Sequence, residues 1–337
     1  MSHPQPHRRA LLATLAAGAS GFAAWQSGLE SPAKSGMARI AISLDLEMSR
    51  NFPRWEDTHW DYEKGNLDET SKRCTTAVCD MVRSAGGVAH LFVLGRMFEQ
   101  ADVDWLLRLV RQGHPVGNHT YDHVNITGRR LEELQYRFNR APWLVEGKTP
   151  EQVIRDNIRL TTAAIETRLG VKPAGFRTPG GFPGGLADRP DVRGWLKEAG
   201  FTWVSARYPT HPAAAAGIEP DARFIAALVA AQEQAQPFTY PDGLVEVPMS
   251  PISDIGAFRT GRWKLPWFIR ATRACLEAVI DKGQCFDFLG HPSCLGVIDP
   301  GLETIRMILE VVEKNRHRAT LVGLDALAGQ AKPARKG

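Results

Sequence analysis

From residue 38 onward the chain alternates short apolar segments with amphipathic ones, and this alternation limits it to a small set of folds. Period-two apolar patterns predict strands over residues 39–46, 89–94, 114–117, 174–177, 201–205, 244–248, 285–289 and 319–322. Helical patterns between them cover residues 67–84, 102–112, 150–169, 192–199, 265–282 and 302–315. A regular β-then-α order implies parallel strands joined by crossover helices, so we expect an α/β barrel or a doubly wound sheet.

A single domain is expected over residues 36–330. The Ala- and Pro-rich stretch at residues 211–220 is interpreted as an inserted loop and not as a linker, because a strand pattern resumes after it. Residues 331–337 form a short basic tail, and residues 1–35 are interpreted as a leader that does not contribute to the fold.

The leader has the features of an export signal. Arg8 and Arg9 precede an uncharged, mildly apolar stretch that lasts to Leu29, and this pattern resembles a twin-arginine signal. Glycine, serine and glutamine dilute the hydrophobicity that a stable membrane span needs. We therefore expect export to the periplasm or the exterior, with no membrane span after processing. An uncleaved single-helix anchor and a disordered tail are the alternatives.

Charge and composition exclude several classes of protein. The chain is 43% hydrophobic and 23% charged, as in ordinary globular proteins, which excludes a disordered or collagen-like chain. The formal net charge of +4 comes from the two ends, so residues 31–330 are neutral. A neutral body lacks the positive surface that nucleic-acid binding requires. Beyond residue 30, charges interrupt every apolar run before the roughly 20 residues that a bilayer span needs.

The five cysteines are expected to be core residues without disulfide bonds. Their number is odd, and they show neither CxxC pairing nor zinc-finger spacing. Cys74 and Cys79 are five residues apart on a predicted helix, so they point in different directions and are not expected to form a bridge.

Two acids stand at the end of the first predicted strand. The apolar side chains of residues 39–46 alternate, so Asp45 and Glu47 share the opposite face. Parallel α/β folds place ligands and catalytic groups at this carboxyl end of a strand. Two neighbouring carboxylates repel each other unless a cation or a proton lies between them, which indicates a metal site. A solvated strand end with two surface acids would show the same spacing.

Two histidines follow the third predicted strand. His119 and His123 are four residues apart, and side chains at this separation meet on one turn of a helix. Two imidazoles so placed are a common clamp for a transition metal. Their strand-end position matches that of Asp45 and Glu47, which favours a joint site over two unrelated loop residues. Two histidines and one carboxylate leave a coordination position open for water, as in catalytic zinc sites.

Two further strand ends carry polar residues. Arg177 precedes a turn shaped by Pro179 and two glycines, and its guanidinium presents a fixed positive fork. His291 follows the predicted strand at residues 285–289. Each of these residues taken alone could be purely structural. Together, four strand ends with Asp/Glu, His/His, Arg and His in this order indicate a catalytic site.

These four motifs resemble those of the polysaccharide deacetylase (NodB-homology) family of carbohydrate esterases. The resemblance spans residues 39–324, nearly the whole domain. It implies an α/β fold of the irregular (β/α) barrel type, with fewer strands than a TIM barrel. It also implies a divalent metal, with Zn²⁺ as the expected ion, and hydrolysis of acetyl groups on a polysaccharide or oligosaccharide.

The resemblance also assigns roles to individual residues. Asp45 is the implied general base, His291 is the general acid, and Arg177 orients Asp45. The implied metal ligands are Glu47, His119 and His123. In the usual first motif two aspartates are adjacent, whereas here the two acids are spaced by one residue, as in a subgroup, and Glu47 has the longer side chain. The family's Asp-Trp element, which tunes the acid histidine, is not evident, and Asp254 is the candidate for that role.

The expected substrate is an acetylated glycan that contains N-acetylglucosamine, because an exported hydrolase needs an acetyl donor outside the cytoplasm. Sugar rings stack on aromatic side chains. The aromatic residues placed either to rim the metal site or to pack the loops are Trp55, Trp60, Tyr62 and Phe182. Two alternatives stay open: a metal-dependent hydrolase of a small non-peptide amide, and a non-catalytic carbohydrate-binding barrel. The sequence does not indicate an oligomeric state.

Overall fold

A computed structural model describes residues 36–57, 64–212 and 215–331. The expected leader, Trp60, Tyr62 and residues 332–337 of the basic tail lie outside this part of the chain. Among the helices of the described residues, none is long and apolar enough to cross a membrane.

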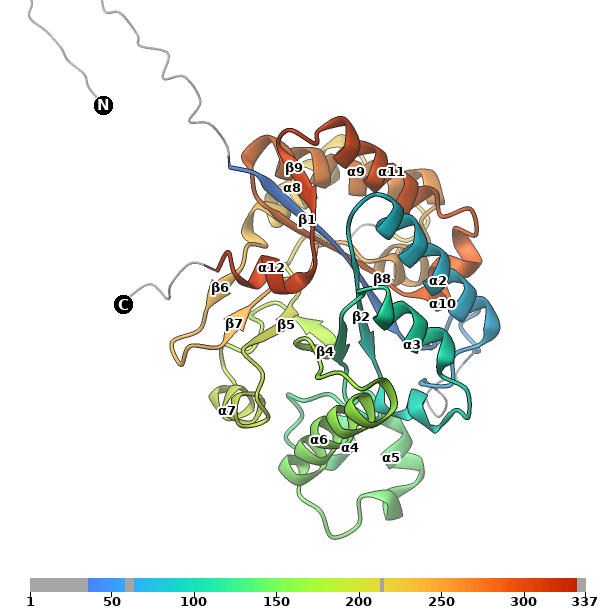
Figure 1. Ribbon diagram of the computed structural model, residues 1–337, viewed down its shortest axis with the longest axis vertical. Coiled ribbons are helices and arrows are strands. Elements are labelled where there is room, and N and C mark those ends of the chain that lie inside the picture. Colours follow the sequence, from blue (N-terminus) through green and yellow to red (C-terminus); the bar gives the residue numbers. More distant parts are fainter. Residues whose placement is uncertain (1–35, 58–63, 213–214, 332–337) are drawn as a thin grey trace, which may run out of the picture. The chain divides into compact units, whose positions relative to one another are not determined.

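The centre of the fold is a nine-stranded sheet, in which every pairing is parallel except that between β6 and β7 (Figure 1). Its order is β6-β7-β5-β4-β3-β2-β1-β8, with β9 paired to β1. The strands are β1 (Ala38–Leu46), β2 (Ala89–Val93), β3 (Val116–Asn118), β4 (Phe176–Phe182), β5 (Trp203–Arg207), β6 (Phe238–Thr239), β7 (Val245–Glu246), β8 (Cys285–Gly290) and β9 (Ala319–Leu321). The eight strands predicted from the sequence are all present, and β6 is additional.

The segment after β7 closes the sheet into an irregular barrel. Val247 and Met249 donate backbone hydrogen bonds to carbonyls of β5. Ser250 N donates to the carbonyl of Asp287 in β8 at 3.1 Å. The segment therefore joins β5 to β8, and the expected irregular (β/α) barrel is confirmed.

Helices surround the strands, with α2 packed against β2 and α3 packed against α2 (Figure 1). The longer helices are α2 (Glu69–Ser84), α3 (Asp104–Arg111), α6 (Pro150–Leu169), α7 (Pro190–Glu198), α8 (Ala222–Gln234), α9 (Leu265–Lys282) and α11 (Glu303–Lys314). Shorter ones are α4 (Leu131–Leu134), α5 (Tyr136–Arg140), α10 (Pro292–Ile298) and α12 (Leu324–Ala328), with 3₁₀ turns η1 (Gly95–Glu99) and η2 (Pro142–Leu144) and the π-helical turn η3 (Gly256–Thr260). All six predicted helices are present.

Helix α8, which was not predicted from the sequence, lies between the loop at residues 211–220 and the strands that follow it. Helix α8 comes next in the chain, and β6 begins only after it. The start of α8 has a regular cap, because the side chain of Asp221 accepts a hydrogen bond from Phe224 N at 2.7 Å.

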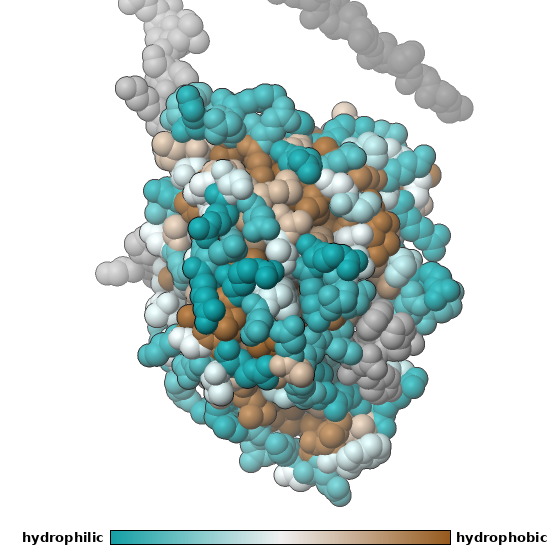
Figure 2. Space-filling model, turned by 45° about the vertical axis from the view of Figure 1, so that its right-hand side comes forward, coloured by the Kyte–Doolittle hydropathy of each residue, from teal (hydrophilic) through white to brown (hydrophobic). Residues whose placement is uncertain are grey.

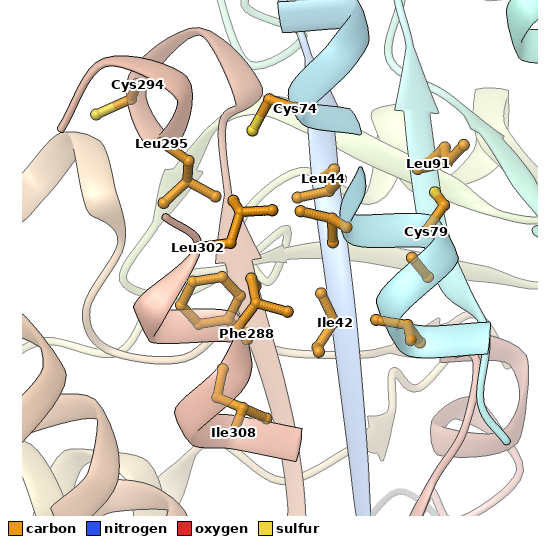
Figure 3. Packing of buried hydrophobic residues seen from close by; sticks show 14 of the residues in the cluster. Ile42, Leu44, Cys74, Cys79, Leu91, Phe288, Cys294, Leu295, Leu302 and Ile308 are labelled. Atoms are coloured by element: carbon orange, nitrogen blue, oxygen red, sulfur yellow. The ribbon is translucent and has the colours of Figure 1, made fainter. Parts of the chain in front are cut away.

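The two faces of β1 meet different surroundings. Ile40, Ile42, Leu44 and Leu46 belong to the largest apolar cluster. Figure 3 shows Ile42 and Leu44 among side chains of β2, β8 and the surrounding helices. On the other face, Ser43 Oγ donates a hydrogen bond to Asp287 Oδ1 of the neighbouring strand β8. The apolar face of β1 therefore belongs to the hydrophobic core outside the barrel, and its polar face belongs to the barrel interior, as the alternation in the sequence predicts.

The five cysteines are buried and unbonded, so their predicted role as core residues is confirmed. Burial raises the pKa of Cys74 to about 12, which keeps this thiol protonated at neutral pH.

Hydrophilic residues cover most of the face of the molecule seen in Figure 2, and hydrophobic residues lie there in separate patches. Within the described residues, the exposed large hydrophobic side chains are Met37, Trp55, Trp143, Leu144, Leu160, Ile218 and Val297.

Replacing Leu44 with alanine is expected to lower the free energy of unfolding by about 3 kcal/mol, because the substitution leaves a cavity between β1 and its helices. Leu160 on α6 is 41% exposed and provides the matched control. Leu160→Ala should change the free energy by less than about 0.5 kcal/mol. Urea denaturation followed by circular dichroism measures both values, and equal effects would contradict the assignment of Leu44 to the core.

Candidate active site

The residues predicted for the site gather at the carboxyl ends of the barrel strands. One cavity of about 330 Å³ is lined by Asp45, Glu47, His119, His123 and His291. Larger hollows of about 460 and 510 Å³ lie on outer helices, and one of about 670 Å³ lies in the 131–147 region. We assign the site to the smaller cavity because its residues could hold a metal and transfer protons.

Arg177 lies beneath this cavity and is completely buried. Its Nη1 donates to Asp45 Oδ1 at 3.1 Å and to Ser43 Oγ at 2.7 Å. On the other side, Nη2 forms an ion pair with Asp287 and donates to Ser205 Oγ at 3.1 Å. The guanidinium is thus held by residues of β1, β5 and β8.

Asp287 is a further site residue, to which the sequence motifs assign no role. Burial raises the pKa of its carboxyl, although Arg177 and Ser43 both favour the ionised form. Ser43 Oγ donates to Asp287 Oδ1 at 2.7 Å. A signal was present in the sequence, since Asp287 alternates with Phe286 and Phe288 as the polar position of an apolar strand.

The loop after β3 brings His119 and His123 together, and the expected helical turn is wrong. Thr120 and His123 both adopt left-handed backbone conformations, with φ of 65° and 59°. Non-glycine residues adopt this region rarely, and such strain is concentrated at functional sites. The ring centroids of the two histidines lie 5.2 Å apart, edge to face.

The hydrogen bond between His119 and the backbone of Arg177 determines which ring nitrogen carries the proton. His119 Nδ1 lies 3.0 Å from the carbonyl oxygen of Arg177. A carbonyl oxygen can only accept, so Nδ1 carries the proton in the hydrogen bond. In the tautomer that carries its proton on Nδ1, the lone pair of Nε2 faces the acids, at 3.8 Å from Glu47 Oε2 and 3.7 Å from Asp45 Oδ2.

Glu47, His119 and His123 fit a divalent metal. Their ligand atoms all lie within 4.8 Å of one another. Glu47 Oε2 is buried 2.6 Å from His123 Nε2, yet it accepts no regular hydrogen bond from any described residue. Lys64 Nζ holds the other oxygen, Oε1, at 3.0 Å. A buried carboxylate oxygen aimed at two imidazoles is a donor set suited to zinc.

The charges of these groups also suit a cation. Burial lowers the pKa of His123 to about 4, so the ring is neutral at neutral pH, although Glu47 opposes this shift. Burial alone would raise the pKa of Glu47, but His123 and Lys64 hold it well below its usual value. Metal binding requires a neutral imidazole and an ionised carboxylate, and both are present.

On the other side of the cavity, His291 is held by Asp254. Asp254 Oδ1 lies 2.7 Å from His291 Nδ1, and Oδ2 accepts a hydrogen bond from His291 N at 2.7 Å. Burial disfavours the charged ring, but Asp254 raises the pKa of His291 above its usual value, with help from Asp45 and Glu47. His291 Nε2 faces Asp45 Oδ2 at 4.0 Å.

Other residues of the cavity wall were not predicted. They include Lys64, Tyr208 and Arg259. Tyr208 packs so closely on Gly181 that a Cβ there would lie 2.6 Å from Tyr208 Cβ. Trp55 and Phe182, expected either to rim the site or to pack the loops, are not among the residues that line the cavity.

Comparison with known proteins gives the same family as the motifs. The polysaccharide deacetylase family model matches residues 63–204, which include His119, His123 and Arg177. A chitooligosaccharide deacetylase of Azorhizobium caulinodans is 36% identical over 73 residues, which are 21% of this chain. The match covers 34% of that protein, so the chain spans about a third of the relative's length.

Solved structures share the fold. A structure from Mycobacterium smegmatis described as a polysaccharide deacetylase is 18% identical, with a TM-score of 0.57 over 90% of this chain and 95% of that one. One from Pseudomonas aeruginosa described in the same way is 11% identical, with a TM-score of 0.59 over 87% and 90%. An allantoinase structure is 12% identical, with a TM-score of 0.58 over 89% and 91%. At these identities the likeness concerns the fold alone.

Zinc titration should separate the metal ligands from the neighbouring acid. Glu47→Gln, His119→Ala and His123→Ala are each expected to weaken Zn²⁺ binding more than tenfold, because even the loss of a group that supports a ligand costs about 10- to 100-fold. Asp45→Asn should retain binding, since all three ligands stay in place. Isothermal titration calorimetry on metal-free protein measures this. Loss of zinc in Asp45→Asn together with retention in Glu47→Gln would reverse the assignment.

Proposed function

Because the polysaccharide deacetylase family model matches residues 63–204, we propose that the chain uses a divalent metal to remove acetyl groups from a glycan containing N-acetylglucosamine. The observation that carries the proposal is the pair of Asp45 and His291, which face each other at 4.0 Å beside the three candidate metal ligands. One side chain can accept a proton and the other can donate one, as amide hydrolysis requires. The expected ion is Zn²⁺.

In this proposal Asp45 is the general base. Arg177 holds Oδ1 of Asp45, so Oδ2 faces the cavity and can accept a proton from the attacking water. A divalent cation held by Glu47, His119 and His123 supplies Lewis acidity for that attack.

His291 is the general acid. Asp254 raises the pKa of His291, which favours the protonated ring, and it holds Nδ1 so that Nε2 points at the cavity. The proton on Nε2 passes to the leaving amine. The turn after Arg177 lines the same cavity through Thr178, Gly180 and Gly181. Backbone N–H groups of this turn are the proposed donors to the oxyanion.

Acetate release from N-acetylglucosamine oligomers tests the proposal. The zinc-loaded protein should release acetate, removal of the metal by a chelator should abolish release, and added Zn²⁺ should restore it. Asp45→Asn should lower kcat by about 10²- to 10⁴-fold, because the amide cannot accept the proton. Ammonia release from a small amide without acetate release from sugars would favour the amide hydrolase. Glycan binding without any hydrolysis would favour the non-catalytic barrel.

The pH profile tests the pairing of His291 with Asp254. Activity requires protonated His291, so kcat/KM should fall as the pH rises through the pKa of His291. Asp254→Asn removes the carboxylate that raises this pKa, and the alkaline limb should therefore move to lower pH. Asp156→Asn, a charge change on the outer helix α6, is the matched control and should leave the limb in place. If the alkaline limb stayed at the same pH in a folded Asp254→Asn protein, Asp254 would not be the group that raises the pKa of His291.

A further inference from the structure

One cation in the cavity wall has no role in the proposed chemistry. Arg259 lies in η3, the π-helical turn that comes shortly after Asp254, and it lines the same cavity as Glu47 and His291. Its Nη1 donates to the backbone oxygen of Arg50 at 3.2 Å. Within residues 36–57, 64–212 and 215–331 it forms no ion pair. Most of its five N–H donors are therefore unused by the protein.

The surroundings of Arg259 leave its charge undercompensated. Burial lowers the pKa of the guanidinium, although the carboxylates of Glu47 and Asp254 favour its charged form. Lys64 also lines the cavity, but its charge is paired with a carboxylate. Glu47 Oε1 lies 3.0 Å from Lys64 Nζ. A half-buried cation with spare donors binds an anion more strongly than an exposed one, because less water competes for it.

The size of the cavity limits where such an anion can lie. About 330 Å³ is at the lower end of the range for small-molecule sites. A sugar unit bound in this cavity would therefore lie against both the guanidinium and the three candidate metal ligands. One cation suits one negative charge, whereas a phosphate monoester carries about two at neutral pH and would call for a second free cation.

We infer that Arg259 recognises a singly charged group, a carboxylate or a sulfate ester, on the sugar unit that loses its acetyl group. The inference rests on the proposed function and narrows its substrate class from acetylated glycans to anionic ones. The planar fork of arginine pairs with two oxygens of either group.

The test compares substrates that differ in one charge. The pair is an N-acetylglucosamine disaccharide with an ether-linked carboxylic acid at O3 of the acetylated ring, and the methyl amide of that acid. A 6-O-sulfated disaccharide and its unsulfated parent form the second pair, and the two pairs separate the two anions. The wild-type protein should release acetate with a kcat/KM about 10- to 100-fold higher for the charged member of at least one pair.

Substitutions of Arg259 test whether this side chain causes the preference for the charged substrate. Arg259→Gln should bring the ratio for that pair close to one, and Arg259→Lys should retain part of it, because the charge remains while the fork is lost. Arg159→Gln, on the outer face of α6 with a side chain 70% exposed, is the matched control and should keep the wild-type ratio. Thermal melts show whether each variant is folded.

The wild-type ratios decide the matter even if Arg259→Gln does not fold. Equal kcat/KM values within both pairs would overturn the inference and leave the deacetylase proposal standing. A preference that survives unchanged in folded Arg259→Gln would also overturn it. No acetate from any sugar would contradict the proposed function itself and remove the basis of this inference.

Discussion

The buried guanidinium of Arg177 is the interaction on which the barrel interior and the candidate site both depend. An unpaired charge in this interior would cost several kcal/mol, so the carboxylates of Asp45 and Asp287 have to lie beside it. They come from β1 and β8, and Ser205 comes from β5. These bonds fix the register of the strands around β4, and they also aim the free oxygen of Asp45 at the cavity.

Much of this arrangement could be predicted from the sequence, because it depends on local rules. The period-two pattern of β1 places Leu44 outside and Asp45 inside, and a shift of one residue would exchange the two faces. Parallel strands bring their carboxyl ends to one rim. One cavity is therefore lined by residues that are far apart in the chain, namely Asp45, Glu47, His119, His123 and His291.

The parts that escaped prediction depend on contacts between distant segments. The left-handed conformation of His123 replaces the expected helical turn, and nothing in the local spacing specifies it. The role of Asp287 depends on its ion pair with Arg177, which is 110 residues away in the sequence. Arg259 reaches the cavity because the 253–260 segment packs against His291. No periodic pattern in the sequence predicts this position.

We propose that one cavity combines a metal held by Glu47, His119 and His123 with the acid–base pair Asp45 and His291. A crystal structure of the zinc-loaded protein with acetate, a product of the proposed reaction, tests it most directly. We expect zinc on those three side chains, with acetate between the metal and His291. Zinc held by Asp45 in place of Glu47, or acetate bound only outside this cavity, would contradict it.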